Sequence, residues 1–239
     1  MRPGGEMGGS RPPVGMAIKM LISPKEGACV LGPSGASSKQ ITDLTGARLH
    51  LSSKGEYYPG TQMQELCLKG STPDVVVQGV MQVISKLAEE TGRIHGGEAE
   101  VEENGARVHF VVPVPSAKAV IGRSGDSIKS LRASSGMKIH IEELVVGSGE
   151  LGEQVVSCAG PMNGLVHVVP TIVEKVTEIA QTPWFQRWAW DIKASPGGVG
   201  NITPYKGKSG DFGKGGFGGK DPGFGKGKGF GAKGGKDPI

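Results

Sequence analysis

Short apolar runs and stretches of helical spacing alternate through the first half of the chain. Apolar runs or alternation predict strands at 17–22, 47–52 and 65–69. Helical spacing that ends at a glycine predicts short helices at 26–31 and 36–45. Ser71-Thr72-Pro73-Asp74 has the hydroxyl, proline and acid typical of a helix start, and apolar residues at helical spacing follow it to Leu87. The predicted order is strand, helix, helix, strand, strand, helix.

The second half repeats this order at a constant offset of ninety residues. Residues 30–52 read VLGPSGASSKQITDLTGARLHLS, and residues 120–142 read VIGRSGDSIKSLRASSGMKIHIE. The corresponding elements are expected at 108–112, 116–121, 126–134, 137–142, 154–158 and 162–179. Pro170 falls inside the last helix and should kink or interrupt it. A repeat of this kind indicates one folded unit used twice.

Composition separates the repeats from the ends of the chain. Residues 1–14 and 192–239 have few apolar side chains to bury, so we expect both ends to be disordered. Beyond residue 192, nine Lys and three Asp give a charge of +6, and the remainder carries −2. A basic tail on a near-neutral body indicates an anionic partner such as nucleic acid. The expected organisation is a first domain at 15–93, an acidic linker at 94–104, a second domain at 105–181, a Trp-rich extension at 182–191 and a Gly/Lys/Phe-rich tail at 192–239.

Several classes of protein are disfavoured. Three cysteines without C-x-x-C spacing argue against a disulfide framework and indicate a reducing compartment. The start, MRPGGEMGGSRPP, lacks the apolar core of a signal peptide, and no run approaches the ~20 apolar residues of a membrane span. We therefore expect a soluble protein of the nucleus or cytoplasm. No nucleophile–base pair or cluster of metal ligands is recognisable, so we expect no enzyme activity and no cofactor or metal.

The candidate chemistry lies in the Gly-x-x-Gly turn that opens the second helix of each repeat. Glycines let the main chain approach a ligand, and the N–H groups at a helix start favour a bound anion. The residues around the two turns do not match other known glycine motifs. Neither GPSGASSK nor GRSGDSIK has the end of a P-loop, the Gly-x-Ser-x-Gly of a hydrolase elbow, or the third Gly of a dinucleotide fingerprint. The repeated turn is therefore a candidate phosphate clamp.

Both repeats resemble KH domains of the eukaryotic type, through V-L/I-G-x-x-G, a short helix and then G-A/M-R/K-L/I-H-L/I. The chain is most similar to the poly(C)-binding proteins, hnRNP K and the Nova splicing regulators, and KGEYYPGTQ at 54–62 resembles the variable loop of Nova-type domains. The resemblance implies an α+β fold of two type I KH domains. Each would be a β-α-α-β-β-α unit with a three-stranded antiparallel sheet backed by three helices, and would bind about four nucleotides of single-stranded nucleic acid.

The resemblance also assigns residues. The backbone clamp would be Gly32, Pro33, Ser34, Gly35, Gly122, Arg123, Ser124 and Gly125. The base groove would hold Val30, Leu31, Ile41, Arg48, Leu49, Leu51, Gln64, Val120, Ile121, Ile128, Leu131, Lys138, Ile139, Ile141 and Gln154. Arg48 stands where poly(C)-binding domains read a cytosine edge, whereas Gln64 and Gln154 replace a second Arg. Because Arg123 adds a charge where Pro33 adds none, we expect the second domain to be the stronger clamp.

Two features outside the repeats are open to more than one interpretation. Phenylalanines alternate with Gly and Lys in the tail, which either binds single strands by stacking and charge or is a solubilising linker. Trp184 and Trp188 lie four residues apart, so with Trp190 they either dock onto the second domain or bind a protein partner. The overall expectation is sequence-selective binding of single-stranded RNA at pyrimidine- or C-containing sites, in splicing, mRNA stability or translation. The alternatives are single-stranded DNA binding in transcription and a protein-interaction scaffold.

Overall fold

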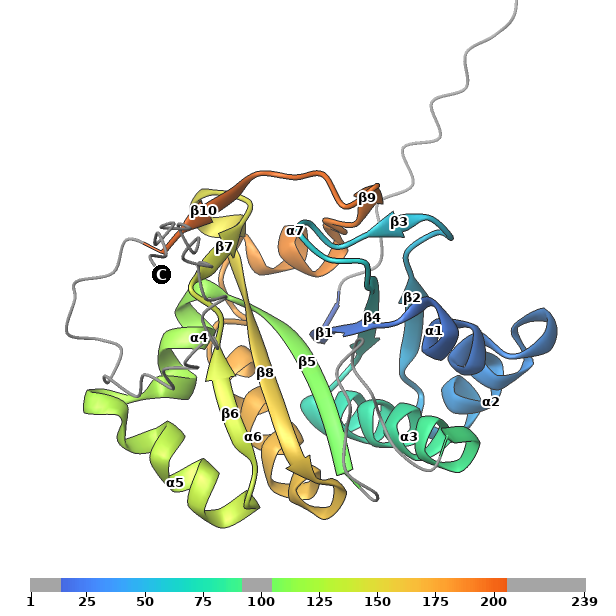
Figure 1. Cartoon of the computed structure of the whole chain (residues 1–239), viewed down its shortest axis with the longest axis horizontal. Coiled ribbons are helices and arrows are strands. Elements are labelled where there is room, and N and C mark those ends of the chain that lie inside the picture. The colour runs from blue at the N-terminus through green and yellow to red at the C-terminus, as the bar shows by residue number, and fades with distance from the viewer. Residues whose placement is uncertain (1–13, 92–104, 206–239) are drawn as a thin grey trace, which may run out of the picture.

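The computed structural model describes residues 14–91 and 105–205, and Figure 1 shows their arrangement. The first repeat contains β1 (Met16–Ile22), α1 (Pro24–Leu31), a 3-10 turn (Pro33–Gly35), α2 (Ala36–Thr45), β2 (Arg48–Leu51), β3 (Glu56–Tyr57), β4 (Gln64–Gly70) and α3 (Pro73–Thr91). The second contains β5 (Gly105–Pro113), α4 (Val114–Ile121), a 3-10 turn (Arg123–Gly125), α5 (Asp126–Ser135), β6 (Lys138–Ile141), β7 (Leu144–Val146), β8 (Glu153–Pro161) and α6 (Leu165–Thr177), with single 3-10 turns before β8 and α6. The predicted order of elements is confirmed in both repeats, and each adds one short strand.

Local sequence explains where α1 begins and how α6 accommodates a proline. Ser23 Oγ accepts a hydrogen bond from the Glu26 N–H, and the Glu26 carboxylate accepts one from the Ser23 N–H, so α1 begins with a capping box. Of the two effects expected at Pro170, an interruption does not occur, since α6 continues through this residue. Pro170 and Val166, whose carbonyl loses its helical partner, are both exposed, and water can satisfy that carbonyl there.

A single antiparallel sheet spans both repeats. Its order is β2-β4-β1-β5-β8, and β6 and β7 both pair with β8. Where β1 meets β5, Met20 lies opposite Phe110, its own counterpart ninety residues later, while Lys19 lies opposite Val111 and Leu21 opposite His109. Exchanging each residue for its equivalent in the other repeat leaves this set of pairs unchanged. A two-fold axis through the strand pair therefore relates the repeats. The division at 15–93 and 105–181 stays a prediction, because the repeats share this sheet.

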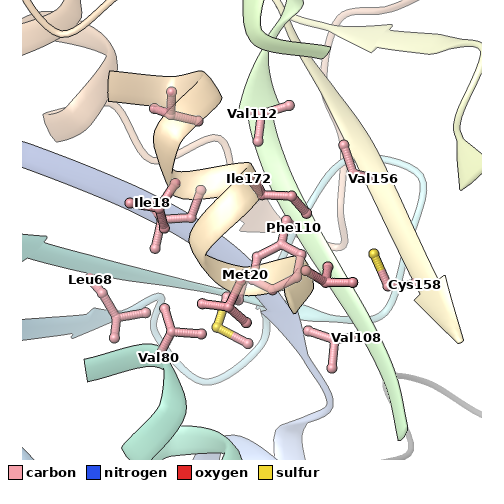
Figure 2. Packing of buried hydrophobic residues seen from close by; sticks show 14 of the residues in the cluster. Ile18, Met20, Leu68, Val80, Val108, Phe110, Val112, Val156, Cys158 and Ile172 are labelled. Carbon is pink, nitrogen blue, oxygen red and sulfur yellow. The ribbon is translucent and has the colours of Figure 1, made fainter. Parts of the chain in front are cut away.

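The helices of both repeats cover one face of the sheet, with α3 and α6 packed against each other. Figure 2 shows the core beneath the β1–β5 junction, which the two repeats build together. Side chains from alternate strand positions meet the helices there: Ile18, Met20, Leu68, Phe110 and Val112 from the sheet, Val80 from α3 and Ile172 from α6. Since this core crosses the repeat boundary, each repeat stabilises the other.

The segment after the second repeat covers the opposite face. The helix α7 (Phe185–Trp190) packs against β1, on the side of the sheet away from α3 in Figure 1. Farther along, β9 (Ser195–Pro196) pairs with β3, and β10 (Ile202–Pro204) pairs with β7. The expectation of disorder from residue 192 was therefore wrong up to residue 205, because composition does not reveal pairing with strands far away in the sequence. Val14, the last residue of the N-terminal segment expected to be disordered, is buried and bonds to Gln186. The rest of that segment, the predicted linker at 94–104 and the predicted disorder of residues 206–239 lie outside the described residues.

A buried cluster of charges fastens this segment to the sheet. Lys19 Nζ lies 3.1 Å from Glu65 Oε1 and 3.0 Å from Glu153 Oε2, and all three side chains are fully buried. Trp188 Nε1 donates to Glu153 at 2.7 Å, and Lys19 also donates to the Asp191 carbonyl. Burial disfavours the ammonium, but the two carboxylates outweigh it and raise the pKa of Lys19, whereas burial raises the pKa of Glu153 to about 6. The cluster thus joins β1, β4, β8 and α7.

Candidate nucleic-acid interface

The two Gly-x-x-Gly turns have the same backbone conformation. The φ angles are +68° at Gly32, +53° at Ser34 and +79° at Gly35, and the matching values in the second turn are +73°, +54° and +79°. Of the residues that the structure describes, Ser34 and Ser124 are the non-glycine residues with positive φ. A left-handed backbone is uncommon for serine and marks a constrained position. Both repeats therefore maintain the same strained turn.

The first glycine of each turn packs too closely against the following helix to carry a side chain. A Cβ on Gly32 would lie 2.2 Å from Ser37 Oγ, and a Cβ on Gly122 would lie 2.4 Å from the Cβ of Ser127. The second glycine has more space, since the nearest atom to a Cβ on Gly35 would be 3.8 Å away, but its positive φ favours glycine. The spacing of two glycines and a serine thus folds the turn tightly against the helix that follows.

Both turns are exposed at their middle residues, and each lies at the start of a helix. The middle residues Pro33, Ser34, Arg123 and Ser124 are all exposed. The helices α2 and α5 begin at these turns, and neither has a side-chain hydrogen bond that caps its N-terminus. The 3-10 turn bonds the N–H groups of Ala36 and Asp126, the first residues of these helices, to the carbonyls of Pro33 and Arg123. The positive end of each helix dipole faces the Gly-x-x-Gly turn. This arrangement can bind a phosphate group.

The lysine that follows each turn is placed differently in the two repeats. Lys129 Nζ lies 3.4 Å from the Ser124 carbonyl oxygen and 3.6 Å from the Asp126 carboxylate, so it stays beside the second turn. Its counterpart Lys39 pairs instead with Asp43 at 2.9 Å, one turn farther along its helix. With Arg123, the second turn has two cations beside it, and Asp126 offsets part of that charge. The balance favours the second turn as the stronger phosphate clamp.

Three apolar side chains of the predicted base groove are accessible in the first repeat, and their counterparts in the second are buried. Leu31 is 38% exposed, and Leu49 and Leu51 are half-buried on β2. Their counterparts Ile121, Ile139 and Ile141 are buried, as are Val30, Ile41, Val120, Ile128 and Leu131. An accessible apolar wall therefore belongs to the first repeat, and the more strongly charged turn belongs to the second.

Gln64 and Gln154 have a structural place that sequence reasoning missed. Both side chains are buried. Gln64 Nε2 donates to the Ser52 carbonyl at 2.8 Å, and Gln154 Nε2 donates to the Glu142 carbonyl at 2.9 Å. In each repeat the amide therefore fixes the chain just beyond β2 or β6. Their contact with a base stays a prediction, and the geometry favours the structural role.

Arg48 and Lys138 are exposed at the first positions of β2 and β6. Arg48 lies opposite Lys69 on β4, so the two side chains share the face of the sheet that Leu49 does not. On that face Arg48, Lys69 and Trp190 line a cleft of about 320 Å³. Alternation along β4 could have placed Lys69 beside Arg48, but nothing local in the sequence places Trp190 there.

The tryptophans of the extension dock onto the sheet. Docking was one of the two alternatives expected from the sequence, and binding of a protein partner was the other. Trp188 is fully buried and bonds to Glu153 of the second repeat, while α7 as a whole packs against β1 of the first. Docking therefore involves both repeats rather than the second alone, and Trp188 is inaccessible to a protein partner. Trp184 and Trp190 are half-buried.

Residues 14–91 and 105–205 show neither a group of metal ligands nor a membrane-spanning helix. In these ranges no three His, Cys, Asp or Glu side chains are grouped as metal ligands would be, and no helix is long and apolar enough to cross a membrane. Burial raises the pKa of Cys67 to about 11 and that of Cys158 to about 12, so both side chains are thiols at neutral pH.

Comparison with known proteins identifies part of the chain. The KH domain family matches residues 107–172, from β5 through the second Gly-x-x-Gly turn into α6, so the chain contains a KH domain. RNA-binding protein Pasilla of Drosophila melanogaster is 25% identical over 168 residues, which cover 69% of this chain and 21% of Pasilla. RNA-binding protein Nova-2 of Homo sapiens is 26% identical over 200 residues, which cover 78% of this chain and 39% of Nova-2. The chain thus spans less than half the length of these relatives.

The similarity to Nova-2 agrees with the resemblance seen in the sequence, whereas grouping with poly(C)-binding proteins and hnRNP K stays a prediction. Among solved structures, Dim2p from Pyrococcus horikoshii OT3 is 14% identical and the match covers 72% of this chain and 97% of Dim2p. Its TM-score is 0.24, and a superposition this poor has no bearing on function.

Proposed function

We propose that this chain, with its KH domain at 107–172, binds single-stranded RNA through both Gly-x-x-Gly turns. The observation that supports the proposal best is the same left-handed turn in front of an uncapped helix at two places ninety residues apart. KH turns of this kind clamp about four backbone nucleotides. A phosphate at each turn would lie at the positive end of the α2 or α5 dipole and could accept hydrogen bonds from N–H groups beyond the first residue of the helix.

Base selection is proposed to differ between the repeats. In the first, the accessible side chains of Leu31, Leu49 and Leu51 can pack against bases. Arg48, exposed at the edge of the sheet, can donate to the acceptor atoms of a cytosine, which favours pyrimidine- or C-containing sites. In the second, Arg123 and Lys129 strengthen the phosphate contact, and Lys138 is the counterpart of Arg48.

The biological setting follows from what the chain resembles. Pasilla and Nova-2 are both named as RNA-binding proteins. We extend this to post-transcriptional regulation in the nucleus or cytoplasm: splicing, mRNA stability or translation. The lysines beyond Tyr205 would add affinity that does not depend on sequence. The proposal includes no catalytic step.

Asp substitution in the turns tests the clamp. Replacing Pro33 and Ser34, and also Arg123 and Ser124, by Asp puts negative charge where phosphates should lie. Affinity for a pyrimidine-rich RNA should fall about tenfold or more, since hydrogen bonds to charged groups are worth roughly 1.5–3 kcal/mol. Fluorescence anisotropy measures the affinity, and circular dichroism checks the fold.

The control for the Asp pair in the first turn places the same two negative charges elsewhere on the protein. Val199 and Asn201 are exposed between β9 and β10, so Val199→Asp with Asn201→Asp should leave RNA affinity nearly unchanged. Equal affinity of the turn variant and this control would refute the clamp. Crosslinking in cells then separates the alternatives: recovery of single-stranded DNA favours a role in transcription, and recovery of protein without nucleic acid favours a scaffold.

A further inference from the structure

The cleft beside α7 lies on the face of the sheet opposite the helices. It has a volume of about 320 Å³ and is lined by Val14, Gly46, Arg48, Lys69, Gly70, Ser71 and Trp190. Arg48 comes from the edge strand β2, Lys69 and Gly70 come from its neighbour β4, and Trp190 is the last residue of α7. The other three lie just outside the strands: Val14 before β1, Gly46 before β2 and Ser71 after β4. A volume of this size is at the lower end of small-molecule sites, which span roughly 300–1,000 Å³.

The chemistry of the lining is cationic and aromatic. Lys69 Nζ lies 3.7 Å from the centroid of the Trp190 ring, so the ring fixes the ammonium at the cleft. Arg48, directly across from Lys69 in the strand pair, adds a guanidinium, and Ser71 adds a hydroxyl. No acidic side chain is among the seven lining residues. The cleft therefore favours an anion attached to a flat or apolar group.

We infer that this cleft binds one nucleoside phosphate, with Lys69 and Arg48 on the phosphate and Trp190 against the base or sugar. The two cations match the phosphate charge, and Arg can bind it with two parallel hydrogen bonds. An indole ring is a good stacking surface for any base. The cavity is also larger than a lone phosphate would need. An acidic peptide supplies negative charge but nothing that would use the ring.

The position of the cleft suggests where the nucleotide comes from. Among the described strands, β2 is at the end of the sheet and pairs only with β4. Leu49 and Leu51 lie on its helix side, and Arg48 lies on its cleft side. An RNA strand that leaves the first groove over this edge reaches the cleft. The inference for RNA rests on the proposed function, whereas binding of a free mononucleotide does not.

Two kinds of probe separate these sources. The free nucleotide is 5′-CMP, with cytidine as the probe that lacks the phosphate, and a hexaglutamate peptide represents an acidic protein segment. The strands are a C-rich RNA tetramer, which fills one groove, and a longer C-rich RNA, which can also cross the edge. Binding to the full chain is followed by calorimetry and by fluorescence anisotropy.

The variants act on the cleft and leave the candidate base reader Arg48 in place. Lys69→Met removes the charge and keeps the length of the side chain, Lys69→Arg restores the charge, and Trp190→Leu removes the ring. Lys86→Met is the matched control, because Lys86 lies on α3, on the opposite face, where it pairs with Glu90. Circular dichroism of each variant confirms that it is folded.

The expected result is that CMP binds at least about tenfold more tightly than cytidine, as one charged hydrogen bond predicts. Lys69→Met and Trp190→Leu should weaken CMP and the longer RNA by a similar factor and leave the tetramer unchanged. Lys69→Arg and Lys86→Met should bind like the wild type. If CMP binds but the longer RNA is insensitive to these variants, the ligand is a free nucleotide.

The cleft inference is overturned if wild-type protein does not bind CMP, if hexaglutamate binds more tightly than CMP, or if Lys69→Met and Trp190→Leu behave like Lys86→Met with every probe. Failure of the proposed function has a different signature. Then the wild type binds neither RNA, or the Asp variant of the two turns binds the tetramer as tightly as the wild type does.

Discussion

Single-residue differences between the repeats change the surface around the two Gly-x-x-Gly turns. Ser38 stands where Ile128 is buried in the second repeat, and its hydroxyl donates to the Gly35 carbonyl at 2.9 Å. A side chain this short stays at the turn, and Leu31 next to the turn is left accessible. Conversely, Arg123 replaces Pro33. The first repeat therefore has more accessible apolar surface at its turn, and the second has more positive charge; under the proposed function these would serve bases and backbone respectively.

Arg48 is the residue on which base preference should depend. Arg48→Ala should cost on the order of 1–3 kcal/mol of binding free energy if Arg48 reads a base edge, and the loss should be larger on C-rich than on U-rich RNA. Anisotropy titrations on both RNAs measure the difference, with Lys138→Ala as the matched change in the second repeat. An equal loss on the two sequences would instead make Arg48 a phosphate contact, as its position at the cleft allows.

The buried carboxyl of Glu153 makes stability depend on pH. Burial raises its folded-state pKa to about 6, above its ordinary value, so the folded protein holds this proton more tightly than the unfolded chain does. The stabilisation from this group is complete below about pH 4.3 and is lost as the pH rises through 6. The size of the effect is on the order of 2 kcal/mol.

Glu153→Gln removes this group from the titration. The amide oxygen can still accept the Trp188 N–H, so the fold should persist, and the fall in unfolding free energy between about pH 4.3 and 6 should disappear. Urea denaturation across this range measures it. Glu150→Gln changes an exposed carboxylate three residues away and should keep the slope of the wild type. A Glu153→Gln protein with an unchanged slope would contradict the assignment.

Among the elements, α7 has an effect out of proportion to its six residues. It contacts β1, its Trp188 hydrogen bonds to β8, and the backbone N–H groups of Lys193 and Ala194 just after it donate to Glu65 on β4. The helix is too short to be stable alone. It is ordered because it closes the buried charge cluster, and in doing so it ties the strands of both repeats together.

Removing the Trp188 side chain should therefore destabilise the whole sheet. Trp188→Ala leaves a cavity and takes a donor from a buried carboxylate, at a cost of about 3–5 kcal/mol. Trp184→Ala, at a half-buried position four residues earlier, should cost much less. Urea unfolding followed by circular dichroism measures both. A loss below about 1 kcal/mol for Trp188→Ala would show that α7 is not integral to the fold.

Local patterns and distant contacts explain what sequence reasoning found and what it missed. The element order and the two turns were predictable, because helical spacing, the glycines and the serine at 37 or 127 act within a few residues. The hydrogen bond of Gln64 was not foreseen, because its partner carbonyl at Ser52 is twelve residues away. The pairing of β9 with β3 and the seat of Trp190 beside Lys69 depend on contacts over more than a hundred residues, and no local pattern contains them.

For the molecule as a whole, the two-fold relation fixes how the grooves are disposed. β2 and β6 lie on opposite sides of the β1–β5 junction, five strand spacings apart, or about 24 Å. The axis also reverses the direction of one groove relative to the other. A single RNA strand that fills both must turn back between its two sites. The RNA spacer, rather than the protein linker, then sets the effective concentration of the second site.

RNAs with two C-rich sites and spacers of increasing length test this geometry. Very short spacers should bind no better than a single site, and affinity should rise once the spacer can cross the sheet and reverse direction. Longer spacers should then lose affinity slowly. Calorimetry gives both affinity and stoichiometry. A large gain in affinity at zero spacer would show that the grooves are not held in this arrangement.

The pairing of Met20 with Phe110 also predicts how a fragment with only one repeat would behave. A fragment that contains one repeat would expose the unpaired edge of β1 or β5. It would also expose the surface of α3 or α6 that packs against the other helix in the full chain. Such an edge is a template for another chain, so the fragment should dimerise through the same register or aggregate. If such a fragment does not bind RNA, the cause would then be self-association through the exposed strand edge rather than a defect in its groove.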